Sequence, residues 1–182
     1  MINLKKRVLP QSVEVGGRYY PVQTDFRYYI RFSELIGIKG VNLSEFDFMY
    51  RGRMPENRAA GFEALCAFFF PKKELPRILE GTNEPVMDYE LDAPYIYAAF
   101  MERYGIDLID IGELHFMKFT ALLDGLHDTR LCDIMSFRAW RSEGGTPEYN
   151  QRMMQLKEMW RLPDKSDSED EELADFDARL NA

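Results

Sequence analysis

The stretch Tyr89–Arg138, YELDAPYIYAAFMERYGIDLIDIGELHFMKFTALLDGLHDTRLCDIMSFR, contains three helical patterns in succession. Each pattern has one apolar stripe, because bulky side chains recur every three or four positions. The stripes are Ile96, Phe100 and Tyr104; then Ile111, Leu114, Phe119 and Leu122; then Leu131, Ile134, Met135 and Arg138. A helix with one apolar stripe must bury that stripe against another element. We therefore expect these three helices to pack together at the centre of a mainly α fold.

Capping residues predict where the three helices begin and end. The expected limits are Asp92 and Gly105 for the first, Asp110 and Gly125 for the second, and Asp128 or Thr129 for the start of the third. Asp110 is a good N-cap candidate because Glu113 follows it at the spacing of a capping box. A glycine after a helix can adopt the left-handed conformation that closes it. Three separate helices are therefore predicted.

The N-terminal part contains a hairpin signal. Gly16-Gly17 lies between two β-favouring segments, and both glycines can adopt the positive φ that a two-residue hairpin loop requires. Two strands are not stable alone, so we expect the side formed by Val13, Val15 and Tyr20 to pack against helices. If the hairpin belongs to a larger sheet, the missing strand is expected within residues 40–48.

Three more helical patterns lie outside the central stretch. They are expected over residues 25–36 with Thr24 as N-cap, from Pro55 until Pro71 stops the helix, and from Thr146-Pro147 until Pro163 stops it. Residues 72–87 are predicted to be a linker with at most a short helix around 75–79. The chain is thus predicted to be a single helical domain over residues 1–163, with a β-hairpin at 12–22. An acidic, flexible and disordered tail is expected over residues 164–182.

Charge and hydropathy exclude several classes of protein. The formal net charge is −8, of which residues 164–182 carry −6, so the rest of the chain carries only −2. No basic excess large enough to follow a phosphate backbone exists, so we expect no nucleic-acid partner. The longest apolar runs have seven residues, whereas a membrane span needs about 20. MINLKKRVLP lacks the following run of about 7 to 15 apolar residues of a signal peptide, so a cytoplasmic protein is expected.

The sequence contains no recognisable catalytic constellation. Cys66 and Cys132 have no zinc-ligand spacing, and no glycine-rich phosphate loop or nucleophile with its base is present. His115 and His127 are the only histidines, and His115 is predicted to be a hydrogen-bonded core or boundary residue. We therefore expect no enzyme, cofactor or metal. An enzyme would need a concave polar pocket around His115 or around the carboxylates of residues 107–113.

Several apolar side chains are candidates for binding a partner. The consecutive phenylalanines at 68–70 cannot all face one side of a helix, so one of them must pack against a second element or be exposed for a partner. Packing is the favoured alternative for that residue. Methionine-rich helices are also suited to repacking against varied partners, although the ten methionines could equally fill the core. The candidate residues are Phe68, Phe69, Phe70, Met153, Met159, Trp160, Phe176 and Leu180.

Two stretches carry a resemblance to a known family: MINLKKRVLPQSVEVGGRYYPVQTDFRYYIRF at residues 1–32 and LDAPYIYAAFMERYGIDLIDIGELHFMKFTALLDGL at residues 91–126. They resemble proteins that the tail modules of siphophages and of prophages in Gram-positive bacteria encode next to the tape-measure gene. The resemblance covers the chain from Met1 to about Leu162, and the middle stretch is the more specific part. Phe116 and Met117 stand where the family pattern carries tryptophans.

The resemblance implies a role in phage tail morphogenesis. Family members are thought to be tail assembly chaperones that keep the tape-measure protein soluble in the host cytoplasm until the tail tube forms. The implied partners are the tape-measure protein and other tail-assembly proteins, with a possible homo-oligomer. The resemblance brings no catalytic residue and no cofactor. The alternative from a different class is a structural component of the mature phage tail.

Removal of the tail after Pro163 is expected to leave the melting temperature nearly unchanged. Ordering a residue loses about 1–2 kcal/mol of backbone entropy, and the local charge of −6 opposes compaction. Leu173, Phe176 and Leu180 are the only large apolar side chains available to offset this loss. Thermal unfolding of the full and truncated chains, followed by circular dichroism, measures the difference. A large decrease in melting temperature would show instead that the tail is part of the core.

Overall fold

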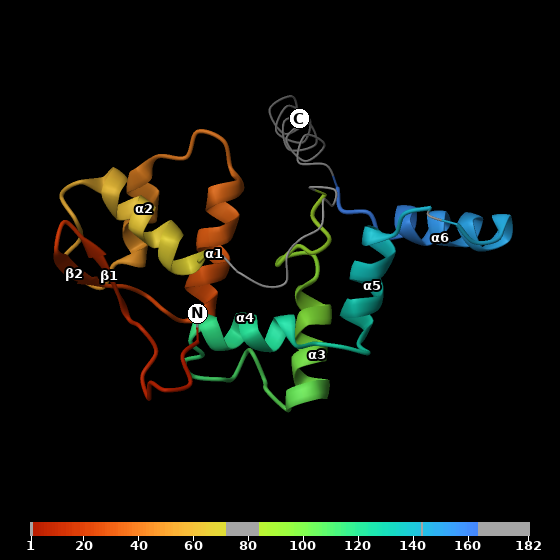
Figure 1. The fold of residues 1–182 in the computed structure, drawn as a ribbon, viewed down its shortest axis with the longest axis horizontal. Helices are drawn as coiled ribbons and strands as arrows, with labels where there is room; N and C mark the ends of the chain where they lie inside the picture. The colour runs from red at the N-terminus through yellow and green to blue at the C-terminus, as the bar shows by residue number, and fades with distance from the viewer. Residues whose placement is uncertain (1, 72–83, 143, 164–182) are drawn as a thin grey trace, which may run out of the picture. The chain divides into compact units, whose positions relative to one another are not determined.

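The computed structural model describes residues 2–71, 84–142 and 144–163. These residues form seven helices and one two-stranded antiparallel hairpin (Figure 1), which confirms the predicted mainly α fold. The elements are β1 (Ser12–Val15), β2 (Arg18–Pro21), α1 (Phe26–Gly37), the 3-10 helix η1 (Leu43–Met49), α2 (Arg58–Phe69), α3 (Ala93–Tyr104), α4 (Phe116–Asp124), α5 (Arg130–Ala139) and α6 (Pro147–Met159).

The chain divides into two compact units, and the division runs through α3. Unit 1 contains Met1–Gly81 and Phe100–Leu126, and unit 2 contains Thr82–Ala99 and His127–Ala182. The prediction of one domain over residues 1–163 stays a prediction. The predicted disordered tail at 164–182 and the short helix at 75–79 lie outside the described residues.

In unit 1 the hairpin forms as predicted and packs against the helices. Gly16 and Gly17 have φ of +57° and +75°, which matches the right-handed twist of the paired strands. Val13 pairs with Tyr20 across the strands, and both side chains are buried in the apolar core. β1 lies beside α2 (Figure 1). No larger sheet forms among the described residues, since most of the segment 40–48 belongs to η1.

A short antiparallel pairing in unit 1 joins the start of α1 to the start of α4. The Phe26 N–H donates to the Leu114 carbonyl at 2.9 Å, and the Phe116 N–H donates to the Thr24 carbonyl at 2.7 Å. The Asp25 carboxylate accepts from the Arg27 N–H at 3.0 Å, so Asp25 is the N-cap of α1. The prediction of Thr24 as N-cap is wrong by one residue, because the Thr24 carbonyl takes part in this pairing.

Arg27 fixes the loop that leads into α4. Its Nη2 donates to the carbonyls of Leu108 and Ile111 at 2.9 and 3.1 Å, and its Nη1 donates to the Gly112 carbonyl at 3.2 Å. The same Nη1 lies 3.2 Å from the Asp25 carboxylate. One guanidinium therefore satisfies several loop carbonyls that a continuous helix would have used internally.

The predicted start of the second central helix, with Asp110 as N-cap, is wrong. α4 begins at Phe116, and its N-cap is His115, whose Nδ1 accepts from the Met117 N–H at 3.2 Å. Glu113 does not close a capping box; its carboxylate lies 3.2 Å from Arg51. The physical reason is that the loop carbonyls accept hydrogen bonds from Arg27, a residue far away in the sequence, instead of from the next turn of a helix.

The remaining boundaries follow the predictions more closely. Gly105, with φ of +63°, follows α3 as the expected C-terminal glycine. Thr129 and Thr146 are the N-caps of α5 and α6. α2 begins three residues later than Pro55, since Asn57 is its N-cap and accepts from the Ala60 N–H at 3.1 Å.

The predicted apolar stripes supply most of the buried side chains of the central stretch. The buried stripe residues are Ile96, Phe100, Leu114, Phe119, Leu131, Ile134 and Arg138. In unit 1 the Phe119 ring stacks on Phe26 and on Phe100, with centroid distances of 4.7 and 5.2 Å. Aromatic stacking of this kind adds to the free energy gained from burial alone.

In unit 2, Arg138 of α5 joins three segments of the chain. Its Nη1 and Nη2 lie 2.6 and 2.9 Å from the two carboxylate oxygens of Asp92, the residue before α3. Nη1 also donates to the Val86 carbonyl at 3.0 Å, and Nε donates to the Trp160 carbonyl at the end of α6 at 2.5 Å. The side chains of Arg138 and Asp92 are only 8% and 1% exposed. Each nitrogen of the buried Arg138 guanidinium therefore donates a hydrogen bond, and both Asp92 oxygens accept one.

Arg138→Met is expected to lower the free energy of unfolding of unit 2 by about 3–5 kcal/mol, because Asp92 would remain as an uncompensated buried charge. The two tryptophans of the chain, Trp140 and Trp160, both belong to unit 2, so urea denaturation followed by tryptophan fluorescence measures this unit. Arg152→Met on the exposed side of α6 is the matched control and should change the value by less than about 0.5 kcal/mol. Equal effects of the two substitutions would contradict the structural role of the pair.

Acid is expected to destabilise unit 1 through His115. Burial lowers the pKa of His115 below its ordinary 6.5, partly opposed by the hydrogen bond to the Pro10 carbonyl and by Glu113, while the Lys118 charge lowers it further. As pH falls, His115 is therefore protonated in the unfolded chain before it is protonated in the folded chain. Its contribution to the free energy of unfolding is fully present above pH 6.5 and decreases below that pH. A proton on Nδ1 would also abolish the N-cap acceptor of α4.

His115→Asn keeps a capping oxygen but does not titrate. Urea denaturation followed by far-ultraviolet circular dichroism, at about pH 7.5 and about pH 5.5, should show a smaller loss in the variant than in the natural chain. His127 is present in both chains, so its contribution cancels. An identical pH dependence would exclude the role of His115.

Candidate functional site

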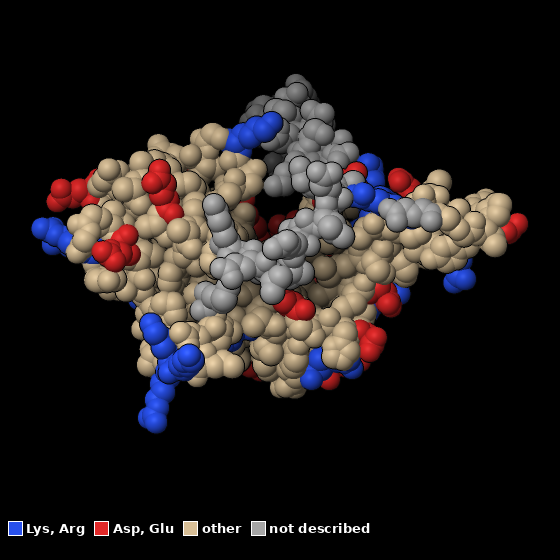
Figure 2. Space-filling view, viewed as in Figure 1, with Lys and Arg blue, Asp and Glu red and all other residues tan. Residues whose placement is uncertain are grey.

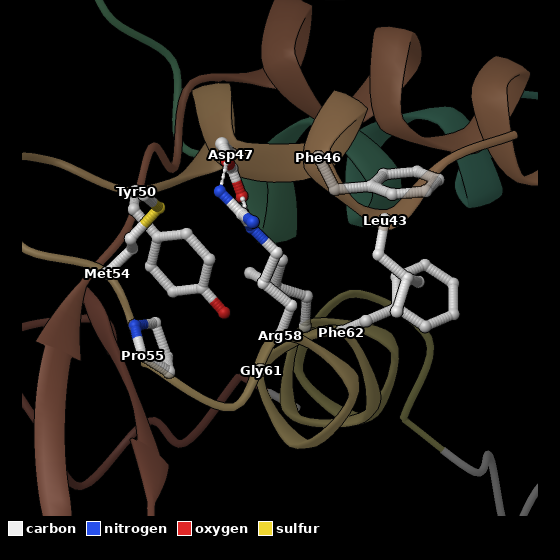
Figure 3. Close-up of a pocket in the computed structure, with 10 residues that line it drawn as sticks. Leu43, Phe46, Asp47, Tyr50, Met54, Pro55, Arg58, Gly61 and Phe62 are labelled. Carbon is white, nitrogen blue, oxygen red and sulfur yellow. Dashed lines mark hydrogen bonds and ion pairs between the residues drawn. The ribbon is translucent and has the colours of Figure 1, made fainter.

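A recess opens in unit 1 between η1 and α2 (Figure 3). Its cavity volume is about 10 Å³, which is about the space that one water molecule needs. The lining residues are Leu43, Phe46, Asp47, Tyr50, Met54, Pro55, Arg58, Gly61, Phe62 and Leu65. Most of these side chains are apolar, so the recess is a small apolar site with few polar groups.

The Tyr50 hydroxyl is the unusual polar group of this recess. Its oxygen is buried and has no hydrogen-bond partner among the described residues. Figure 3 shows the hydroxyl directed toward α2, where a Cβ on Gly61 would lie only 2.8 Å from it. Burial raises the pKa of Tyr50 to about 12, with smaller contributions from Asp47 and Tyr20. The hydroxyl therefore stays protonated near neutral pH.

An ion pair between Asp47 and Arg58 lies beside the Tyr50 ring. Arg58 Nη2 is 2.9 Å from Asp47 Oδ2, and Arg58 Nε is 3.3 Å from Asp47 Oδ1 (Figure 3). The Arg58 side chain is half exposed, so this pair contributes about 0–1 kcal/mol to stability. Because the two charges neutralise each other, the recess carries no net charge for a ligand to match.

The three predicted phenylalanines occupy different environments in unit 1. Phe69 is only 3% exposed and belongs to the core, with its ring centroid 4.6 Å from that of Phe116. Phe68 is half-buried and lies 5.3 Å from the same ring. Phe70 is 42% exposed, although its ring also contacts Tyr29. Phe70 is therefore the member of the run with the most surface available to a partner.

α6 of unit 2 presents apolar side chains at its surface. Met159 is 72% exposed, Met154 is 61% exposed and Tyr149 is exposed as well, whereas α6 has no buried residue. In Figure 2 the surface over α6 is mainly uncharged. Met154 was not among the sequence candidates; its signal was the Met153-Met154 pair, of which Met153 is the half-buried member.

Trp160 packs against other residues of unit 2. Its ring packs edge-on against Tyr95 at a centroid distance of 5.7 Å, and the Arg130 guanidinium lies 5.1 Å from the centre of the same ring. Its carbonyl accepts the Arg138 hydrogen bond described above. Phe176 and Leu180, the last two predicted partner-binding residues, lie outside the described residues. For all eight candidates, partner binding stays a prediction.

Two other kinds of site are absent from the part of the chain that the structure describes. No group of three His, Cys, Asp or Glu side chains is placed there to hold a metal ion. No helix in that part has both the length and the apolar character needed to cross a membrane.

Comparison with known proteins gives a family match. A family model described as Bacteriophage Gp15 protein matches residues 67–162, which is just over half of the chain. The matched range contains α3 to α6, including Asp92, Arg138 and the exposed methionines of α6, whereas the lining of the recess lies before it. No match was found among curated proteins or among solved structures.

Proposed function

The chain belongs to the bacteriophage Gp15 protein family, and from this premise we propose that it is a non-enzymatic tail assembly chaperone. In this proposal it binds the phage tape-measure protein in the cytoplasm of the bacterial host and keeps that protein soluble during tail morphogenesis. Other tail-assembly proteins, or a second copy of the chain, are further partners of the same role.

The family match is the observation that carries the proposal. It includes the stretch 91–126, whose resemblance to proteins of phage tail modules suggested this role. Tape-measure proteins are long, and a chaperone for such a chain has to bind many similar segments rather than one unique shape. A surface that adapts to varied apolar side chains suits this task.

The exposed methionines of α6 support the proposal because they provide such a surface. Met154 and Met159 have flexible, unbranched side chains, and Met-rich surfaces repack against partners of different shape. Met154 and Met159 are five residues apart, so they lie about 140° apart around α6 and offer two separate apolar contacts. Both methionines lie within the range that the family model matches. We therefore place the partner contact on α6.

Co-expression with the tape-measure protein of the same phage tests the proposal. The tape-measure protein should be recovered in the soluble fraction and in a pull-down only when this chain is present. Met154→Glu combined with Met159→Glu should reduce recovery about tenfold, because a charge placed in an apolar contact must be desolvated without a partner. Gln151→Glu combined with Gln155→Glu adds the same charge to exposed positions of α6 and should preserve recovery.

Two results would contradict the proposal. In the first, the tape-measure protein is equally soluble without this chain and no complex is recovered. In the second, mass spectrometry of purified virions finds this chain at a fixed copy number, which would favour a structural component of the mature tail. A chaperone should be absent or nearly absent from the virion.

A further inference from the structure

We propose that the N-terminal arm, residues 2–8, is a docking site for the acidic tail, residues 164–182, of a second copy of the chain. The arm carries three consecutive cations, and the acidic tail carries a formal charge of −6. The chemistry of this docking is independent of the proposed function. Only its use, which is to place several copies along one tape-measure protein, rests on that function.

The N-terminal arm extends from a fixed base in unit 1. The Leu9 side chain packs against the apolar core, and the Pro10 carbonyl lies 3.0 Å from Nε2 of His115. Residues 2–8, which precede this base, are all exposed. The arm is therefore held at one end and open to a partner along its length.

A turn within the arm presents its cations. The Asn3 carbonyl accepts from the Lys6 N–H at 3.0 Å, and Asn3 Oδ1 accepts from the Lys5 N–H at 2.9 Å. Lys5, Lys6 and Arg7 form no ion pair with any described residue. Figure 2 shows Lys and Arg side chains protruding at the lower left, where Figure 1 shows the arm. Three positive charges are therefore available to an anionic partner.

Apolar side chains lie among these cations. Leu4 is 95% exposed and Val8 is 69% exposed, and Ile2 is exposed as well. A surface that combines apolar side chains with positive charge is complementary to a partner that combines apolar side chains with negative charge. The expected partner is therefore an acidic peptide that also carries apolar residues.

The acidic tail has this composition. Seven acidic residues and no basic residue lie within positions 167–177, and the large apolar side chains of the tail are Leu173, Phe176 and Leu180. A nucleic acid fits the arm less well, because tight binding to a phosphate backbone needs many cations. Residues 1–163 carry a net charge of −2 and so add no basic excess to the arm.

Docking of one copy on the next is a heterologous contact, in which two different surfaces meet. Such an assembly keeps one open arm at one end and one open acidic tail at the other, so further copies can add in a row. A chaperone that binds many similar segments of a long protein needs several copies side by side. A second copy is therefore the occupant that matches the proposed function.

Sedimentation velocity of the full chain tests the proposal. At about 0.01 M salt, charges act over about 30 Å, and the weight-average mass should increase with protein concentration. At about 1 M salt this distance falls to about 3 Å. The mass should then return to the 21.4 kDa of one chain.

Two charge-reversed variants separate the two sides of the contact. The arm variant combines Lys5→Glu, Lys6→Glu and Arg7→Glu. The tail variant replaces the four consecutive acidic residues 169–172 by Lys, which changes the tail charge from −6 to +2. Each variant alone should associate at least about tenfold more weakly than the natural chain, because like charges then face each other. An equimolar mixture should restore association, because each arm then meets a tail of opposite charge.

A matched control combines Arg18→Glu, Lys39→Glu and Arg53→Glu. These three cations are exposed in unit 1 outside the arm, so the control changes the net charge as much as the arm variant does. It should associate as the natural chain does. Circular dichroism should show the same helix content in all variants, since every described position that is changed is exposed.

Four results would overturn the proposal. A constant mass of 21.4 kDa at low salt would exclude docking between copies, and equal weakening by the control and the arm variant would exclude the arm as the site. A mixture that associates no better than its components would exclude pairing of the arm with the tail. Nucleic acid that co-purifies with the natural chain and not with the arm variant would identify a phosphate backbone as the partner. The experiment contains no tape-measure protein, so failure of the co-expression experiment would leave a positive result valid.

Discussion

A buried carboxylate at the residue before a helix, held by an arginine, is the constraint on which each unit depends. In unit 1 Asp25 precedes α1 and is bound by Arg27, and in unit 2 Asp92 precedes α3 and is bound by Arg138. A buried charge destabilises a fold unless it is paired and its remaining oxygens are hydrogen-bonded. Asp25 meets this condition through the N–H groups of Leu114 and Arg27, and Asp92 meets it through the Asp88 N–H. The two arginines then use their other donors to hold distant carbonyls, so one requirement fixes both the helix starts and the segments around them.

The sequence predicted the elements well because their signals are local, and it failed where a distant residue decides. Gly16-Gly17, Thr129 and Thr146 act within a few residues of themselves, and each has the predicted role. Asp110 had an equally good local capping pattern. However, Arg27 donates hydrogen bonds to the carbonyls on either side of Asp110, so α4 begins after His115 instead. Capping patterns describe what a segment could do alone. They contain no information about hydrogen bonds from a guanidinium that lies more than eighty positions away in the sequence.

The candidate sites were less predictable, for a related reason. Residue type alone does not show that Phe69 is buried and Phe70 exposed, or that Met153 is half-buried and Met154 exposed. The exposure of each side chain depends on which neighbour covers it. The recess was not predicted at all. Tyr50 directly follows η1, and only the packing of η1 on α2 places its hydroxyl against Gly61. A tyrosine near a helical glycine in the sequence would not have been a sufficient signal, because the missing hydrogen-bond partner is visible only in three dimensions.

The way in which Arg27 holds its loop has an evolutionary consequence. Its guanidinium donates to the backbone carbonyls of Leu108, Ile111 and Gly112. Every residue type offers the same carbonyl, so the exposed loop positions are free to diversify while the shape of the loop is preserved. Arg27 has no such freedom, because lysine lacks the planar fork of donors that reaches several acceptors at once. Sequence drift should therefore be rapid at Ile109 and Asp110, which lie within the range that the family model matches, and slow at Arg27, which lies outside it.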